Sequence, residues 1–295
     1  MGMIGEQYDF EAEDWREVLR HNGLRGFEDI WNLPHVWVQR PNTRHHGFAG
    51  VARHEFTLPD GSRRGYYVKI HRNRLRRTAR RPWLGTPVLQ HELRNHRSCA
   101  IAGVGSPRPV YCANRMVEGQ HRGIFVTEEV TTHQPLASVI AAWELKGRPP
   151  TIERWWVIDA VAAQLRALHD ARLRVAAYTP EHIFVRVEHG DGSVAGEANV
   201  SVRLLDLERI RVSVLPRRTQ VADLVTLHLA TPELHWNERL RFLISYLGVD
   251  QLTPAVKHLW YRVARAAEAK QRRRSEGRHR GFRGLRIRLG LRKPD

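Results

Sequence analysis

A lysine and two carboxylates stand where phosphate chemistry would need them. Lys69 lies in the apolar segment YYVKIHR, and lysine is scarce in this chain, which has 5 Lys against 43 Arg. A compact ammonium charge at this position suits a bound phosphate, and an arginine guanidinium does not replace it freely. Glu92 follows in QHELRNHRS, where a helical carboxylate could hold the lysine in place. Asp206 ends the apolar run VRLLD, and Mg²⁺ binds one or two such carboxylates together with phosphate oxygens.

Each of these residues also has a plainer explanation. Lysines of strands are usually solvated, and a helical glutamate such as Glu92 carries no signal alone. An aspartate at the end of a strand often caps a turn, and this reading of Asp206 stays open. The order of the three residues along the chain, not any one of them, favours a nucleotide site.

The elements that would position these residues follow from hydrophobic periodicity. Alternating segments around Asp60-Gly61 predict a hairpin whose second strand puts Tyr67 and Lys69 on one face and Val68 and Ile70 on the other. The predicted strands are 35–58 (interrupted by a turn), 64–72, 124–130, EHIFVRVE and NVSVRLLDLERIRV. The predicted helices are short segments in 9–33, then 88–102, one after Pro135, 151–169, 220–230, 236–246 and 254–274.

This order predicts an α+β chain with a sheet-rich N-terminal lobe at 1–130 and a mostly helical C-terminal lobe at 131–270. A cleft between lobes is a usual place for a small ligand. Residues 271–295 form a basic tail, because 262–295 contain 13 Lys/Arg and 3 acids. A second basic run, HRNRLRRTARR at 71–81, has six Arg and no acid.

Net charge, hydrophobicity and cysteine content limit the kinds of protein that this chain could be. The net charge of +17 implies an anionic partner, either nucleic acid or the inner face of a membrane. No stretch has the roughly 20 apolar residues of a transmembrane helix, and the N-terminus lacks a secretory signal pattern. Two cysteines cannot build a disulfide framework. We therefore expect a cytoplasmic protein.

Several segments together resemble the lipopolysaccharide kinase family of the InaA/WaaP type, across nearly the whole chain. The similar segments are GFEDIWNLP, VWVQRPNTRHHGFAGVAR, VKIHR, ELRNHRSCAIAGVGSPRPVYC, EHIFV and LLDLERIR. The segment LHDARLRVAAYTPEHIFV at 168–185 has the place and length of a kinase catalytic loop. The resemblance implies a bilobal protein-kinase-like fold that uses ATP and Mg²⁺ to phosphorylate a heptose or Kdo sugar of the lipopolysaccharide core, or a lipid-linked precursor.

The resemblance also implies roles for individual residues. Lys69 would contact the nucleotide phosphates, Glu92 would pair with it, and Asp206 and His182 would hold the metal. The remaining residues implied to contact or support the nucleotide and the catalytic loop are His46, Gly47 and Gly50 of the phosphate-covering turn, Glu128 and Glu129 beside the adenine through their main chain, and Asp223 behind the catalytic loop.

The sequence departs from the kinase pattern in the catalytic loop itself. Counting back from His182, which aligns with the metal-binding Asn, places Ala177 where the proton-accepting Asp belongs. A general base contributes typically ~10²–10⁴-fold, so its loss leaves slow transfer by positioning and charge. Glu181 and Tyr178 are the candidate substitutes.

Three classes of function therefore stay open at this point. The first is a kinase at the cytoplasmic face of the inner membrane, held to anionic lipid by the basic tail. The second is a pseudokinase of the same fold, which Ala177 and His182 favour. The third, a nucleic-acid-binding protein, rests on charge alone, and the tail has no recognisable DNA- or RNA-binding motif, so no specific nucleic acid is expected. A histidine metalloenzyme is disfavoured because the chain lacks His-Glu-x-x-His.

Overall fold

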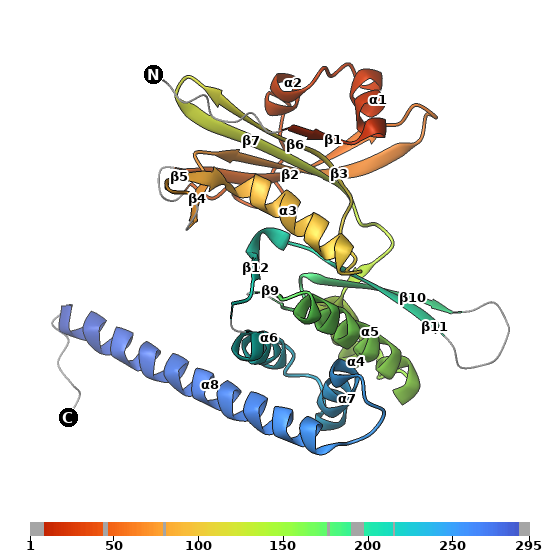
Figure 1. Ribbon diagram of the computed structural model, residues 1–295, viewed down its shortest axis with the longest axis vertical. Coiled ribbons are helices and arrows are strands. Elements are labelled where there is room, and N and C mark those ends of the chain that lie inside the picture. Colours follow the sequence, from red (N-terminus) through yellow and green to blue (C-terminus); the bar gives the residue numbers. More distant parts are fainter. Residues whose placement is uncertain are drawn as a thin grey trace. The chain divides into compact units, whose positions relative to one another are not determined.

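A computed structural model of the chain describes residues 9–43, 47–78, 81–175, 178–189, 198–214 and 216–288 (Figure 1). The chain forms two compact units. The first contains Met1–Gln134, Phe184–Arg186 and Ser201–Arg211, and the second contains Pro135–Ile183, Val187–Val200 and Val212–Asp295. The chain passes between the units within strands β10 (Ile183–His189) and β11 (Ala198–Leu204).

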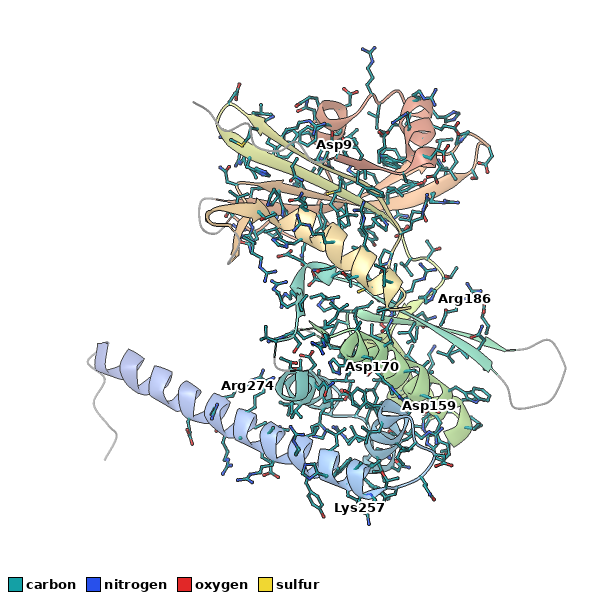
Figure 2. The ribbon with its side chains drawn as sticks, in the orientation of Figure 1. Asp9, Asp159, Asp170, Arg186, Lys257 and Arg274 are labelled. Atoms are coloured by element: carbon teal, nitrogen blue, oxygen red, sulfur yellow. The ribbon has the colours of Figure 1, made fainter. Side chains whose placement is uncertain are left out.

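The first unit is built on a five-stranded antiparallel sheet in the order β1-β6-β7-β3-β2. Its strands are β1 (Asp9–Glu11), β2 (Phe48–Thr57), β3 (Arg63–Arg72), β6 (Pro109–Val117) and β7 (Gln120–Glu128). The predicted hairpin at Asp60-Gly61 is confirmed, with Gly61 at a φ of 82°. Asp9, labelled in Figure 2, accepts hydrogen bonds from Arg115 and so ties the short β1 to β6.

The two faces of this sheet bury different helices (Figure 1). On one face, Val68 and Ile70 pack with apolar residues of α1 (Glu13–His21) and α2 (Phe27–Trp31), including Trp15 and Ile30. On the other face, Leu89 and Leu93 of α3 (Val88–Ile101) pack against Cys112 and Phe125. Because side chains alternate along a strand, the predicted face of β3 that carries Tyr67 and Lys69 is the one that meets α3.

Short elements join this sheet to its neighbours. The basic run at 71–81, for which no fold was predicted, contributes to a two-stranded pair, β4 (Leu75–Thr78) and β5 (Arg81–Pro87), that leads into α3. Strand β8 (Gln134–Pro135) pairs with β10, and β10 pairs with β11. The strand predicted to run through NVSVRLLDLERIRV is wrong in its second half. The strand β11 ends at Leu204, and a 3-10 turn, Leu207–Arg209, separates it from the short strand β12 (Ile210–Val212). Strand β12 pairs with β9 (Leu173–Val175).

The second unit is helical. Its helices are α4 (Leu136–Lys146), α5 (Thr151–Asp170), α6 (Pro216–Ala230), α7 (Trp236–Leu247) and α8 (Pro254–Arg288). The helix predicted to end at 274 continues to Arg288, so part of the predicted basic tail is helical. Residues 271–276 of α8, including the Arg274 labelled in Figure 2, are all exposed, and the helix extends past α6 in Figure 1.

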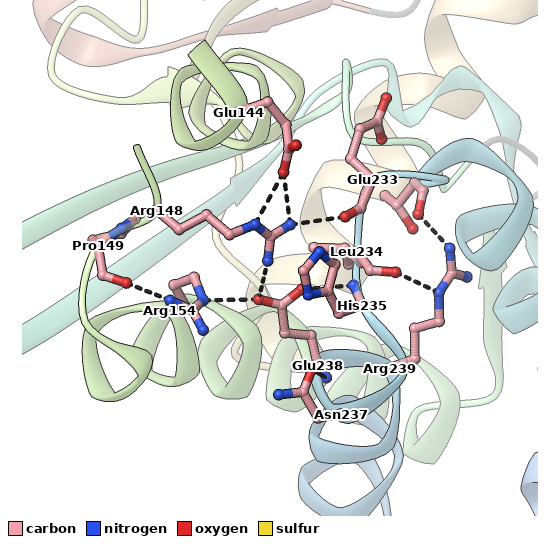
Figure 3. Close-up of polar contacts among 11 residues, drawn as sticks. Glu144, Arg148, Pro149, Arg154, Glu233, Leu234, His235, Asn237, Glu238 and Arg239 are labelled. Carbon is pink, nitrogen blue, oxygen red and sulfur yellow. Dashed lines mark hydrogen bonds and ion pairs between the residues drawn. The ribbon is translucent and has the colours of Figure 1, made fainter. Parts of the chain in front are cut away.

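A buried carboxylate fastens three segments of this unit together (Figure 3). Glu238 is fully buried near the start of α7, and its Oε1 accepts hydrogen bonds from Arg148 Nη1 at 2.6 Å and Arg154 Nε at 2.7 Å. Its Oε2 accepts the backbone N–H of His235 at 2.8 Å, which completes a capping box. Because breaking a buried ion pair costs roughly 3–5 kcal/mol, Glu238 fixes α7 to α5 and to the segment that precedes it.

Candidate functional site

Lys69 and Glu92 form an ion pair inside the first unit, as the resemblance implied. The Lys69 Nζ lies 2.5 Å from Glu92 Oε1. The two side chains keep only 18% and 2% of their exposure, respectively. Strand β3 points Lys69 toward α3, and the second turn of α3 brings Glu92 to meet it. The spacing of 23 residues therefore reflects a strand and the helix that covers it.

Burial and neighbouring charges shift the pKa values of both members of this pair. Burial lowers the pKa of the Lys69 ammonium, but the carboxylates of Glu92 and Asp206 outweigh burial and leave that pKa above its usual value. Burial raises the pKa of Glu92, and Lys69 offsets part of this rise. Glu92 Oε2 is buried, and none of the described residues forms a hydrogen bond with it. The charges of Asp206 and Glu208 act on both members of the pair, so four charged groups share one region of the unit.

Asp206 follows β11 at a strained turn. Its φ of 58° is left-handed, a conformation that L-residues other than Asn and Asp seldom adopt. Its carboxylate is 30% exposed and lies 3.7 Å from Arg209 Nε. Strain of this kind collects at functional turns, where neighbouring contacts hold it.

Asn95 supplies those contacts, and the sequence reasoning missed it. Its Nδ2 donates to the carbonyl oxygens of Leu207 at 2.7 Å and Ile210 at 3.3 Å, so α3 clamps the turn directly after Asp206. Asn95 follows Glu92 by three residues, which puts both on one side of the helix. That spacing was the available signal.

The predicted phosphate-covering turn is described only in part. His46 lies outside the described residues. A Cβ at Gly47 would come within 2.8 Å of Arg74 Cδ, and a Cβ at Gly50 would come within 2.4 Å of the Trp37 ring. Gly50 therefore makes room for an indole on the face of β2 opposite Lys69. The strand predicted at VWVQR is wrong, since Trp37 forms only an isolated bridge with Ala52.

Glu128 and Glu129 end β7 as predicted, and their side chains are committed to arginines. Glu129 accepts two hydrogen bonds from Arg53, at 2.8 and 2.7 Å, while Glu128 accepts one from Arg108 at 2.8 Å. Their backbone N–H groups donate to Arg108 and Gly65 carbonyls. The backbone N–H groups of both residues are therefore already used within the first unit.

The second unit holds the segment that resembles a catalytic loop. Buried Asp223 accepts the backbone N–H of Val175 at 2.8 Å and lies 3.4 Å from His169 Nε2. The contact of Asp223 with Val175 is of the kind expected for an acid that supports this loop from the next helix. Ala177, which takes the place of the catalytic Asp, lies outside the described residues.

The two candidate substitutes for the missing base differ. Tyr178 is fully buried, and its hydroxyl donates to Val161 O at 3.1 Å, so its proposed role as a base is wrong. Burial raises the pKa of Tyr178 well above its usual value, which disfavours the phenolate further. Glu181 is exposed, and a hydrogen bond from the Thr179 side chain holds its pKa below the usual value. The partly exposed His182 donates its backbone N–H to Thr179 O at 3.0 Å.

The side chains of the first unit fit a metal ion whose other ligands are phosphate oxygens and water. Among the described residues, no group of three or more His, Cys, Asp and Glu side chains could hold a metal ion alone. Asp206 offers a partly exposed carboxylate beside a buried ammonium. Mg²⁺ commonly uses one or two carboxylates and completes its shell with phosphate oxygens and water. This arrangement therefore suits a magnesium nucleotide better than a resident metal.

Comparison with known proteins decides the family. The model of the lipopolysaccharide kinase (Kdo/WaaP) family matches residues 28–246. The chain belongs to this family. It is 26% identical to Protein InaA of Escherichia coli (strain K12) over 185 residues, which cover 63% of this chain and 78% of that protein. Membership gives the chain a kinase-like role connected with the lipopolysaccharide core.

A solved relative confirms the predicted fold. The structure of WaaP in complex with acyl carrier protein matches with a TM-score of 0.62 and 22% identity, covering 89% of this chain and 98% of that one. The α+β, protein-kinase-like fold is thereby shown. Within the described residues, no helix combines the length and apolar character needed to cross a membrane.

Proposed function

We propose that this member of the Kdo/WaaP family is an ATP- and Mg²⁺-dependent kinase that phosphorylates a heptose or Kdo sugar of the lipopolysaccharide inner core. The observation that carries the proposal is the buried Lys69–Glu92 pair at 2.5 Å with the Asp206 carboxylate acting on it. A phosphoryl-transfer site needs a fixed cation for the phosphates and an oxygen ligand for the metal. In this proposal, Lys69 is the cation and Asp206 is the oxygen ligand.

The residues of the chain divide this work. Bound ATP and Mg²⁺ would supply the transferable phosphoryl group and charge neutralisation. Glu92 holds the Lys69 ammonium in position, and Lys69 neutralises phosphate charge. Asp206 would hold the ion, with Asn95 fixing the turn that carries it. His182, in the second unit, stays a proposed metal ligand on resemblance alone, as do Gly47, Glu128 and Glu129 for the nucleotide.

Binding of the nucleotide is the first test. We would follow the unfolding temperature while titrating ATP with and without Mg²⁺, in the wild type and in Lys69→Ala and Asp206→Ala. Metal-dependent stabilisation that both variants lose supports the proposal. Lys257→Ala, which removes an exposed lysine of the second unit (Figure 2), is the matched control and keeps the full response. The absence of any response at millimolar ATP would contradict a nucleotide site.

A pseudokinase is the second candidate, and a specific observation favours it. Tyr178 is buried against α5, and Glu181 is a weakened base, so neither residue replaces the Asp that Ala177 displaces. Transfer of radiolabelled phosphate from ATP to purified core glycolipid separates the two functions. Label on the acceptor that depends on Lys69 and Asp206 supports the kinase, whereas ATP binding without transfer supports the pseudokinase. Ala177→Asp then shows whether a restored carboxylate raises the rate.

We further propose that the exposed part of α8 holds the protein at the anionic, cytoplasmic face of the inner membrane. Residues 271–276 are exposed and include Arg272, Arg273 and Arg274. Each basic residue near an anionic surface contributes about 1 kcal/mol. Sedimentation with vesicles of phosphatidylcholine alone or mixed with phosphatidylglycerol tests this. Binding should require the anionic lipid and weaken when the three arginines are replaced by glutamine. Equal binding to neutral vesicles would contradict it.

A further inference from the structure

A second group of cations lies beside the Lys69–Glu92 pair, on an adjacent side of α3. Glu92 and Asn95 of this helix face the candidate site. His91 comes directly before Glu92, and Arg94 comes directly before Asn95. Arg76 of β4 and Arg211 of β12 join them. All four cationic or titratable groups belong to the first unit.

Backbone and side-chain contacts bring these three segments together. The N–H of Val88, at the start of α3, donates to Arg74 O at 3.2 Å, which holds β4 and Arg76 near the first turns of the helix. The Asn95 amide donates to Ile210 O at 3.3 Å, which places the following residue, Arg211, by the next turn. Arg211 Nη1 donates to the carbonyl oxygens of Glu208 and Ile210, so its guanidinium stays at this turn.

Two arginines of the cluster, Arg76 and Arg94, are available to an added anion. In the part of the chain that the structure describes, neither Arg76 nor Arg94 forms an ion pair with a carboxylate. His91 Nε2 is buried and forms no hydrogen bond with any residue that the structure describes. Burial and then the guanidinium groups of Arg76, Arg94 and Arg211 lower the pKa of His91 to about 4. Elsewhere in this unit, partly buried arginines such as Arg108 and Arg115 meet carboxylates.

We propose that Arg76, His91 and Arg94 form an anion subsite that accepts a phosphate or carboxylate group, with the positive charge of Arg211 beside it. Guanidinium groups match the oxygens of both anions with paired hydrogen bonds, and the buried His91 nitrogen adds a further contact. The subsite shares α3 and the turn after Asp206 with the Lys69–Glu92 pair. Its assignment to an anionic group of the acceptor rests on the proposed kinase function, whereas the anion binding itself does not.

The resonance of the His91 ring reports binding without any need for activity. We would assign its C2–H signal with His91→Gln and titrate the wild type with inorganic phosphate and pyrophosphate at constant ionic strength set by chloride. The expected result is a saturable shift and a rise in the His91 pKa, because a bound anion favours the imidazolium. The absence of a saturable shift up to ~50 mM phosphate would overturn the proposal, because a site with a Kd of roughly 1 mM would be saturated at that concentration.

Matched variants separate a built subsite from general positive charge. Arg76→Gln with Arg94→Gln should weaken phosphate binding by about tenfold for each guanidinium, as expected for charge-assisted hydrogen bonds. Arg20→Gln with Arg25→Gln removes two exposed arginines from the N-terminal segment of the same unit and should leave the affinity unchanged. Equal weakening in both double variants would overturn the proposal. Unfolding curves show whether each variant folds, and the wild-type titration stands without them.

A final comparison distinguishes the acceptor from the nucleotide as the source of the anion. In Lys69→Ala, phosphate should still shift the His91 signal although nucleotide binding is lost. ATP added to wild type at saturating phosphate should bind without displacing it. Competition between the two, or loss of the phosphate response in Lys69→Ala, would place the anion in the nucleotide site and overturn the proposal. If the protein binds no ATP at all, the proposed function fails while the phosphate titration still decides the subsite.

Discussion

Replacement of Lys69 by methionine tests whether the Lys69–Glu92 pair is a buried ion pair. Glu92 keeps only 2% exposure, its Oε1 has Lys69 as partner at 2.5 Å, and its Oε2 has none among the described residues. Without Lys69, the carboxylate would be buried with no hydrogen bond. Breaking a buried ion pair in this way costs roughly 3–5 kcal/mol of unfolding free energy. The double variant Lys69→Met with Glu92→Leu should recover most of that loss, because apolar residues replace both charges.

The pH dependence of the same variant gives an independent check on the reasoning. Burial already raises the pKa of Glu92, and removing Lys69 takes away the group that offsets this rise. A carboxyl whose folded pKa is raised stabilises the fold below its unfolded pKa of roughly 4.3 and loses that contribution as pH rises through the folded pKa. The deficit of Lys69→Met should therefore be largest at high pH and shrink as pH falls.

Urea unfolding followed by tryptophan fluorescence from pH 5 to 8 measures both effects, since the chain has 9 Trp. Lys146→Met, which removes an exposed lysine, serves as the control and should cost within about 0.5 kcal/mol. A Lys69→Met deficit below about 1 kcal/mol would refute a buried charge pair, because surface pairs fall in that range. A deficit that stayed constant with pH, or that Glu92→Leu failed to relieve, would refute it equally.

Three further substitutions test single contacts. Asn95→Ala removes two hydrogen bonds to the turn after Asp206, so we expect a loss of about 1–2 kcal/mol in urea unfolding and a smaller Mg²⁺-dependent ATP shift. Gly50→Ala brings a Cβ within 2.4 Å of Trp37 and should cost about 1–3 kcal/mol, which Trp37→Leu partly restores; an unchanged urea midpoint would show that the indole moves aside. Tyr178→Phe should cost about 1 kcal/mol and leave any phosphotransfer rate unchanged, whereas a hundredfold lower rate would make Tyr178 a participant.

Much of the site could be predicted from sequence because it depends on patterns that residue types encode. The alternation around Lys69 fixed its side of the strand, and Val68 and Ile70 are buried on the opposite face as that alternation requires. The helix at 88–101 carries Glu92 on its buried side. The strand and helix periodicities gave the two elements, and the resemblance to kinases implied that Lys69 and Glu92 meet.

The rest could not be predicted because it depends on backbone conformation and on distant packing partners. The apolar run around Asp206 reads as a continuous strand, and residue types do not reveal that Asp206 adopts a left-handed φ of 58°. Gly50 reads as a phosphate-loop glycine, although the space above it is taken by Trp37. Tyr178 reads as an available hydroxyl until the packing of α5 shows it buried. Propensity and spacing contain none of this information.

Helix α3 unites these observations. One side presents Glu92 to Lys69 and Asn95 to the turn after Asp206, while the adjacent side presents His91 and Arg94 to the proposed anion subsite. A helix moves as a unit, so any rotation that relaxes one side displaces the other. An anion that orders His91 and Arg94 therefore also favours the α3 position in which Glu92 reaches Lys69. Because such coupling is reciprocal, nucleotide binding should strengthen anion binding by the same factor.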